Sequence, residues 1–170
     1  MGAIGTTSRR RAGRPAEVRS RGAVLVEFAL VAPLLLILLF GIIEFGFAFV
    51  QSMDVRHGAR ETARLVAVNY KPTSAEGSAQ AQEILAEGCA RMDDDGEGSS
   101  IEMVVPGGQA GNPGEVGQRI EVTVHRELEG LTGFFPFIAG RDVSSDVVIR
   151  SEVDATWTTS FDVPVTRVCP

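Results

Sequence analysis

Hydrophobic residues are concentrated in one long run near the N-terminus. Residues 28–50 form an apolar run of 23 residues that only Glu44 interrupts. At a rise of about 1.5 Å per residue, such a helix is about 34 Å long, enough to cross a hydrocarbon layer of about 30 Å. The alternative is a secretory signal, but its apolar region spans about 7 to 15 residues and ends at a small-residue cleavage site. We therefore predict a transmembrane helix over residues 23–50 that is not cleaved at its far end.

The helical pattern continues beyond the apolar run. No proline or turn cluster occurs between Gln51 and Tyr70. Small or apolar residues recur at helical spacing: Val55, Ala59, Thr62, Ala63 and Val66. We expect one helix over residues 23–69 with this stripe buried. A second row at four-residue spacing consists of Arg56, Arg60 and Arg64, with Asp54 and Glu61 offsetting part of its charge. This row fits a solvated face, or else a contact with an acidic neighbour or lipid headgroups.

Shorter patterns follow in the rest of the chain. After a polar linker at residues 73–79, residues 79–92 fit a short helix with Ile84, Leu85 and Cys89 on one side. Strict alternation over residues 118–128 predicts a strand with Ile120, Val122 and Val124 on its buried face. Two more strands are predicted at 100–106 and 143–155. The fold class is therefore α+β: a long N-terminal helix extends into a small module with a short helix and a roughly three-stranded antiparallel sheet.

Four other segments are assigned less regular structure. Residues 93–100 and 107–117 are rich in Gly and polar residues; the first fits a solvated turn and the second a flexible turn. Residues 128–140 are unusually apolar for a connection. They fit a short helix or loop that caps the sheet core, or a surface patch that meets a partner subunit or the membrane. The tail after residue 155 is expected to be extended or loosely docked.

Charge is divided unevenly across the apolar run and predicts the topology. The net charge is −6, but residues 1–22 contain six arginines and one acid, Glu17. Basic residues flank the cytoplasmic side of membrane helices. Residues 1–22 are thus predicted to be a basic cytoplasmic leader, and residues 51–170 an exported module with a flexible C-terminal tail. This topology explains the arginines better than nucleic-acid binding does, because the segment is short and lacks interleaved aromatic residues.

The chain has two cysteines, Cys89 and Cys169, and both follow the apolar run. Outside the cytoplasm they are able to form a disulfide, and in a reducing compartment they stay as two free thiols. No motif for a metal or a cofactor is found, so we expect neither. His57 and His125 are the two histidines, and neither belongs to an H-E-x-x-H motif.

Glu27 is the acidic residue at the start of the apolar run, and three roles fit it. It is suited to the membrane interface near Arg21, or to a helix N-terminus, where the helix dipole stabilises a negative charge. The third role begins with a chain cut between Gly22 and Ala23, which creates an α-ammonium four residues before Glu27. The ammonium of a neighbouring copy then neutralises Glu27 in an assembly. Glu44 lies about 25 Å further along a helix and has a separate role, either as an interfacial acid or in a packing or assembly contact.

The stretch RGAVLVEFALVAPLLLILLFGIIEFG, together with RHGARETAR, resembles the TadE-like family of bacterial tight-adherence (Flp) pilus systems. The resemblance covers residues 21–68 and includes Gly22, four small or apolar residues, then Glu27 and Phe28. It implies a prepilin-like leader, a place in the bacterial inner membrane with the C-terminal domain outside, and other pilus or secretion-system subunits as partners. A prepilin peptidase is a further candidate partner.

Two classes of function remain after this reading. The first is a pilin-like structural or assembly component that acts by membrane anchoring and subunit packing, which is not an enzyme. The second is a membrane-tethered extracytoplasmic enzyme, for which no G-x-S-x-G, C-x-x-C or zinc motif is present. The first accounts for the leader, the helix and the small module together, and we prefer it.

Overall fold

The computed structural model of the chain describes residues 16–93, 97–106, 115–134, 136–157 and 163–170, with side chains from Gly22 onward. The chain divides into two compact units, with the boundary between Gly41 and Ile42. Both units include part of α1, which runs Ala16–Ala67. Most of the predicted leader and parts of both predicted turns, at 94–96 and 107–114, lie outside the described residues.

The first unit consists, in its described part, of the N-terminal section of α1. By length and composition, one described helix is able to cross a membrane: Gly22–Ala67, whose most apolar window has a mean hydropathy of 2.8. None of that window is buried. In the core helix of a soluble protein these apolar side chains would be covered by other elements. The long, uncovered apolar helix therefore suggests membrane anchoring.

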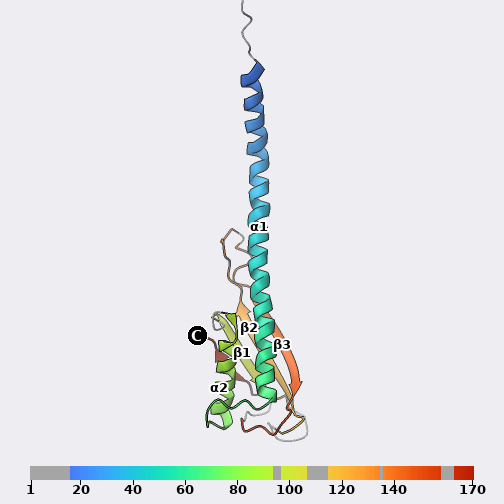
Figure 1. Cartoon of the computed structure of the whole chain (residues 1–170), viewed down its shortest axis with the longest axis vertical. Coiled ribbons are helices and arrows are strands. Elements are labelled where there is room, and N and C mark those ends of the chain that lie inside the picture. Colours follow the sequence, from blue (N-terminus) through green and yellow to red (C-terminus); the bar gives the residue numbers. More distant parts are fainter. Residues whose placement is uncertain (1–15, 94–96, 107–114, 135, 158–162) are drawn as a thin grey trace, which may run out of the picture. The chain divides into compact units, whose positions relative to one another are not determined.

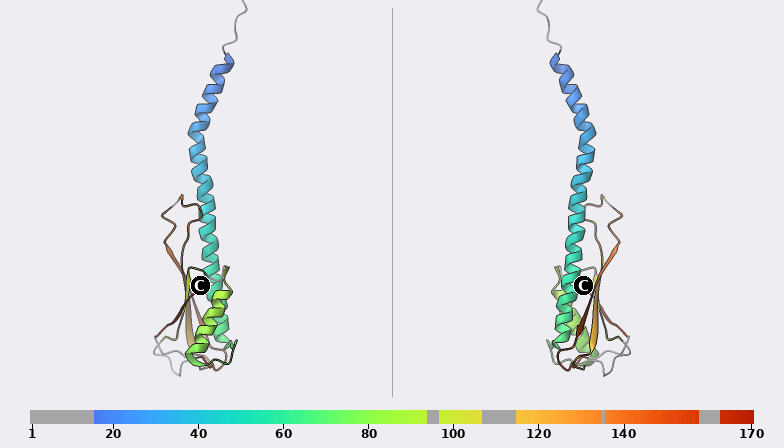
Figure 2. Two further views of the ribbon diagram at one scale, coloured as in Figure 1. Left: turned by 90° about the vertical axis from the view of Figure 1, so that its left-hand side faces the viewer. Right: turned by 90° about the vertical axis from the view of Figure 1, so that its right-hand side faces the viewer.

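The second unit is an α+β module in which both helices lie on one face of an antiparallel sheet (Figures 1 and 2). Its other elements are α2 (Gly77–Ala90), β1 (Ser99–Val104), β2 (Arg119–Glu127), β3 (Asp142–Arg150) and β4 (Val165–Val168). The strand order is β3-β2-β1-β4, and each neighbouring pair is antiparallel. The predicted fold class is confirmed, with one strand more than expected.

The core forms where the predicted periodic faces meet. The stripe on α1 is buried from Val55 to Val66, and Ile84 and Leu85 of α2 are fully buried. On β2, Ile120, Val122 and Val124 are also fully buried, as their alternation predicts. The two helices approach so closely that a Cβ on Gly88 would collide with the Thr62 hydroxyl. Glycine at this position therefore permits the tight contact between α2 and α1.

Helix α1 ends two residues before the predicted end. Asn69 has a φ of 53°, a left-handed conformation that asparagine tolerates at helix C-termini. The Tyr70 amide donates to the Leu65 carbonyl over 3.0 Å and closes the last turn. Strand β3 likewise ends at Arg150 and not at residue 155. Ser151 still exchanges backbone hydrogen bonds with Gly117 and Gln118, but the Glu152 amide donates to the Ala67 carbonyl of α1 over 3.0 Å, so the chain leaves the sheet there.

Of the two forms predicted for the tail, extended or loosely docked, residues Val165–Val168 adopt the extended one, and the described residues after 155 are not loosely docked. Trp157 is fully buried and belongs to the core. Residues Val165–Val168 form β4, which pairs with β1 from Ser100↔Val168 to Met103↔Val165. A four-residue segment is too short to show a clear alternation in sequence. Its structure depends on the free edge of β1, with which it shares the ladder.

Candidate assembly surface

The residues at the start of the apolar run are exposed on α1. Gly22, Ala23 and Glu27 all lie on the surface in helical conformation. A Cβ added to Gly22 would have no atom within 4 Å. Packing in the described structure therefore does not require glycine there, although alanine is the better helix former by about 1 kcal/mol. The described residues thus give no packing reason for glycine at this position.

Glu44 makes a contact within its own chain. Its side chain is 1% exposed. Its Oε2 accepts a 2.9 Å hydrogen bond from the Thr132 amide and a 2.5 Å bond from the Thr132 hydroxyl. Thr132 belongs to the connection between β2 and β3, which we define as the β2–β3 loop, residues 128–141. The structure thus gives Glu44 a packing contact, while any role in assembly remains a prediction.

Gln51 lies two helical turns after Glu44 on the same face of α1. Its amide group is 3.0 Å from both backbone groups of Glu129: Nε2 donates to the carbonyl, and Oε1 accepts from the amide. This arrangement copies the paired hydrogen bonds between neighbouring strands. Gln51 is 4% exposed, so water does not compete strongly for either bond.

Asp54 completes the series one turn further along α1. Its Oδ2 accepts a 2.8 Å bond from the Arg126 guanidinium, and its Oδ1 accepts a 3.0 Å bond from the Asp93 amide. The Asp54 and Arg126 side chains are 5% and 11% exposed. We call the contacts of Glu44, Gln51 and Asp54 with the end of β2 and the β2–β3 loop the polar ladder. Together they hold that loop along α1.

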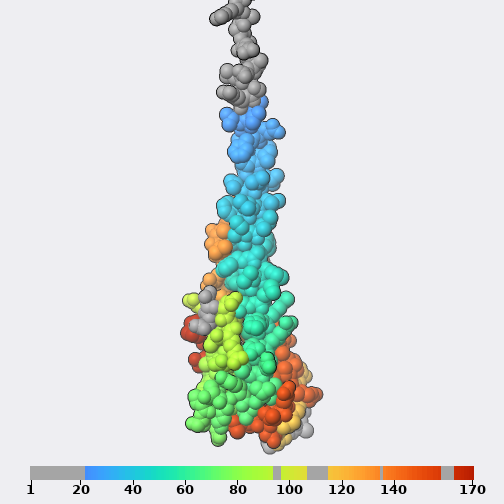
Figure 3. Space-filling model, viewed as in Figure 1, coloured from blue at the N-terminus to red at the C-terminus, as the bar shows by residue number. Residues whose placement is uncertain are grey.

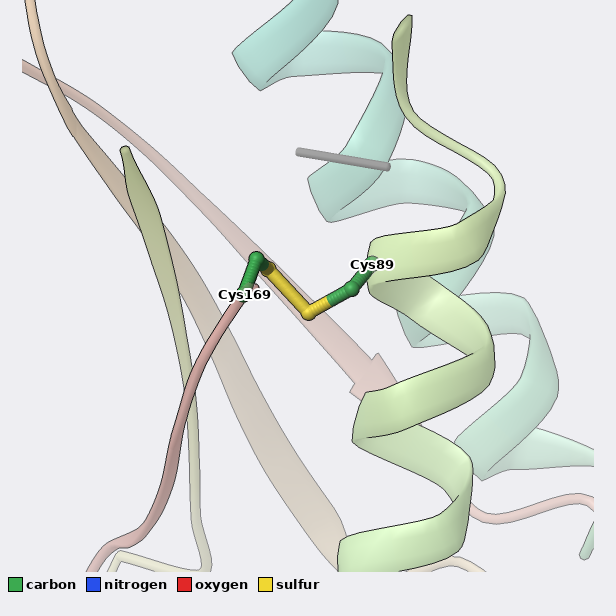
Figure 4. The surroundings of a disulfide bond; sticks show 2 residues. All are labelled: Cys89 and Cys169. Atoms are coloured by element: carbon green, nitrogen blue, oxygen red, sulfur yellow. A yellow bond between two sulfur atoms is a disulfide. The ribbon is translucent and has the colours of Figure 1, made fainter. Parts of the chain in front are cut away.

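Cys89 and Cys169 are joined by a disulfide between α2 and the C-terminal segment (Figure 4). Their Cα atoms are 5.5 Å apart, and the two residues are 80 positions apart in the chain. Both side chains are nearly buried, and the Cys169 amide also donates to the Ser99 carbonyl over 2.9 Å. The disulfide and this hydrogen bond therefore tie the C-terminal segment to the core at two neighbouring points.

The basic row on α1 lies on the exposed face. Arg56, Arg60 and Arg64 are all exposed. Arg60 and Arg64 line an open groove of about 580 Å³ against β3. The two acids expected to offset the charge of this row form ion pairs with other residues: Asp54 with Arg126, and Glu61 with Arg91. Tertiary structure supplies both partners from distant elements, which sequence spacing does not reveal.

Arg91 connects α2 to α1. It donates hydrogen bonds to Glu87, over 3.0 Å, and to Glu61, and its guanidinium lies 5.8 Å from the centre of the Tyr70 ring. The bond to Glu87, and then the bond to Glu61, raise the pKa of the Arg91 guanidinium above its ordinary value. The contacts fix α2 on α1 from the solvent side.

Within the described residues, no group of three or more His, Cys, Asp or Glu side chains is placed to hold a metal ion. His57 and His125 are both exposed. Sequence reasoning missed Gln51, Arg126, Glu129 and Thr132 of the polar ladder, and it gave Asp54 a different role. One signal was present, because Glu44 and Gln51 are seven residues apart and extend the buried stripe of α1 toward the apolar run.

Comparison with known families gives one match. Residues 22–64 match the family model described as TadE-like protein. Comparison with curated proteins and with solved structures finds no match to this chain. The matched segment starts at Gly22, includes Glu27, Glu44, Gln51 and Asp54, and lies entirely within α1. This part of α1 is therefore similar to TadE-like proteins, as the sequence indicates.

Proposed function

We propose that this protein is a pilin-like structural or assembly component of a bacterial tight-adherence pilus or a related secretion apparatus. The observation that carries the proposal is the extent of the family match. It spans both the uncovered apolar section of α1 and the section whose stripe is buried in the α+β module. One helix thus combines a surface suited to lipid or to neighbouring helices with a surface suited to holding the module.

The mechanism under this proposal is packing, since the TadE-like pilus-assembly family is not known as enzymatic. Residues 23–50 anchor the chain in the inner membrane, residues 1–22 stay in the cytoplasm, and residues 51–170 lie outside. Other pilus or secretion-system subunits contact α1. The test is crosslinking of the full-length protein in cells that express the apparatus, followed by identification of the linked chains. Recovery of the protein linked only to unrelated membrane proteins would contradict the proposal.

The topology gives a first prediction. A phosphatase reporter fused after Pro170 is expected to be active, because the enzyme folds only outside the cytoplasm and the arginines of the leader hold the N-terminus inside. A fluorescent reporter that folds only in the cytoplasm, fused before residue 1, serves as the control and is expected to be bright. The opposite pair of results would reverse the assigned orientation.

Processing of the leader gives a second prediction, which concerns Gly22, Ala23 and Glu27. Cleavage after Gly22 would leave a positive amine on Ala23, one helical turn from Glu27. In an apolar setting between subunits, the amine of a neighbour and Glu27 attract each other more strongly than in water. We expect Glu27→Gln to insert normally and to assemble poorly. Val31→Ala, one turn further on the exposed surface of α1, is the matched control and is expected to assemble normally.

Two measurements decide these steps separately. Intact-mass analysis of the membrane-extracted protein, in cells with an active prepilin peptidase, is expected to show Ala23 as the N-terminus. A mass that includes residues 1–22 would refute cleavage. Crosslinking yield between copies then reports assembly, and an unchanged yield for Glu27→Gln would leave Glu27 as an acid at a helix start or at the membrane interface.

A further inference from the structure

The β2–β3 loop presents an apolar surface to solvent. From Gly130 to Gly140 the sequence GLTGFFPFIAG contains no charged residue. Leu131, Phe134 and Phe137 are 57%, 50% and 56% exposed. Exposed side chains of this size rarely gather in one loop of a soluble surface without a binding role. The loop is therefore a candidate contact region.

The loop lies beside the last turns of the apolar run. Figures 1 and 2 show it following α1, and Figure 3 shows part of it, in orange, against the surface of that helix. Its side chains and those of α1 line a shared, largely apolar groove of about 450 Å³, which includes Phe45, Phe49, Phe137 and Ile138. Ile138 is 6% exposed and fastens the loop to the helix, while Phe45 and Phe49 remain 59% and 61% exposed. Loop and helix thus form one continuous apolar surface.

The polar backbone of the loop is largely satisfied from within the chain. Glu44 accepts from the Thr132 amide, Gln51 pairs with both backbone groups of Glu129, and the Phe134 amide donates to the Thr132 hydroxyl over 3.2 Å. At the base of the loop, the Leu128 amide donates to the Arg141 carbonyl, and the Gly140 amide donates to the Leu128 carbonyl. A loop near lipid needs such partners, because each backbone N–H or C=O group without a hydrogen bond there costs several kcal/mol of free energy.

We propose that the β2–β3 loop is a second membrane contact, which inserts Leu131, Phe134 and Phe137 into the outer interfacial layer of the bilayer that α1 crosses. The inference rests on the proposed membrane anchoring. Phe45 and Phe49 belong to the end of the apolar run, so the loop beside them shares their depth in the bilayer. At its base, Arg141 is exposed and suited to lipid phosphates, while its Nε also donates to the Phe137 carbonyl over 3.0 Å.

In this arrangement the polar ladder positions the membrane contact. The ladder fixes the height of the loop along α1 by three contacts spread over residues 44–54. A single-pass helix is free to tilt and rotate about its axis, and interfacial side chains restrict both motions. A membrane contact through the β2–β3 loop, beside Phe45 and Phe49, would therefore help to set the orientation in which the module meets neighbouring subunits. The occupant we assign to the surface is lipid, because the surface is continuous with the apolar run.

Tryptophan fluorescence in proteoliposomes tests the proposal with the full-length chain. Native Trp157 is fully buried, so the wild type supplies a constant background. We expect the tryptophan of Phe134→Trp to emit at shorter wavelength than in water, and to lose most of its added emission to lipids brominated at shallow acyl positions. Leu35→Trp, in the apolar run, is the positive control for deep bromines. Val148→Trp, exposed on β3 at 46%, is the matched control that only aqueous iodide should quench.

The controls separate failure of the loop proposal from failure of membrane anchoring. If brominated lipid quenches Leu35→Trp but leaves Phe134→Trp quenched by iodide alone, the loop proposal is wrong and the anchoring stands. If Phe134→Trp is protected from both quenchers, a second copy covers the loop in place of lipid, and the proposal is also wrong. If brominated lipid does not quench Leu35→Trp, α1 is not in the bilayer, and the proposed function loses its membrane basis.

Discussion

Replacing Cys89 and Cys169 together by serine is expected to lower the free energy of unfolding of the α+β module by about 4 kcal/mol. The disulfide joins residues 80 positions apart, so it removes much of the freedom of the unfolded chain. It also holds the C-terminal segment beside β1, where β4 contributes only four residues to the sheet. Without the covalent link, β4 is expected to separate from the sheet before the rest of the module unfolds.

Denaturant unfolding with and without reductant measures this effect. Reductant is expected to destabilise the wild type to the level of the double variant and to leave the double variant unchanged. Ala90→Ser, at the exposed position next to Cys89, is the matched control and should behave like the wild type. An equal stability of wild type and double variant under oxidising conditions would show that the bond contributes nothing.

Thiol labelling of the protein extracted from cells addresses the compartment. Both cysteines are expected to resist labelling until reductant is added, because an exported module folds under oxidising conditions. Free thiols in the extracted, folded module would argue against export of residues 51–170. The same experiment thus bears on the disulfide and on the topology, while the reporter fusions test the topology alone.

The periodic part of the fold is predictable from the sequence. The buried stripe from Val55 to Val66 and the alternation of Ile120, Val122 and Val124 each mark one face of one element, and local spacing is enough to find them. The structure places those faces in a common core. The long apolar run is equally plain, because its length alone separates it from ordinary core helices.

The polar ladder was not predictable in this way. Its partners are separated by 88 residues for Glu44 with Thr132, 78 for Gln51 with Glu129, and 72 for Asp54 with Arg126. No local pattern specifies such pairs, because the return path of the chain through β2 sets them. The same reason explains the exposed β2–β3 loop, whose apolar content fits a core cap or a surface patch equally well until its position beside α1 is known.

The Asp54–Arg126 ion pair leads to the last prediction. Both side chains are nearly buried, and Asp54 also accepts the Asp93 amide bond. Replacing Asp54 by alanine leaves a buried guanidinium without its partner and a backbone amide without its acceptor. Loss of one partner from a buried pair costs about 3 kcal/mol or more. We therefore expect Asp54→Ala to lower the free energy of unfolding of the module by about 3 kcal/mol.

Two further variants divide this effect into its causes. Asp54→Asn keeps an oxygen for the Asp93 amide and removes the charge, so it is expected to lose less stability than Asp54→Ala. Glu76→Gln removes one member of the exposed pair that Glu76 makes with Lys71, and is expected to change stability little, because water screens exposed charges. Denaturant unfolding of all three variants is the measurement. If Asp54→Ala were as stable as Glu76→Gln, the ion pair would not hold the end of β2 on α1. The polar ladder would then depend on Glu44 and Gln51 alone.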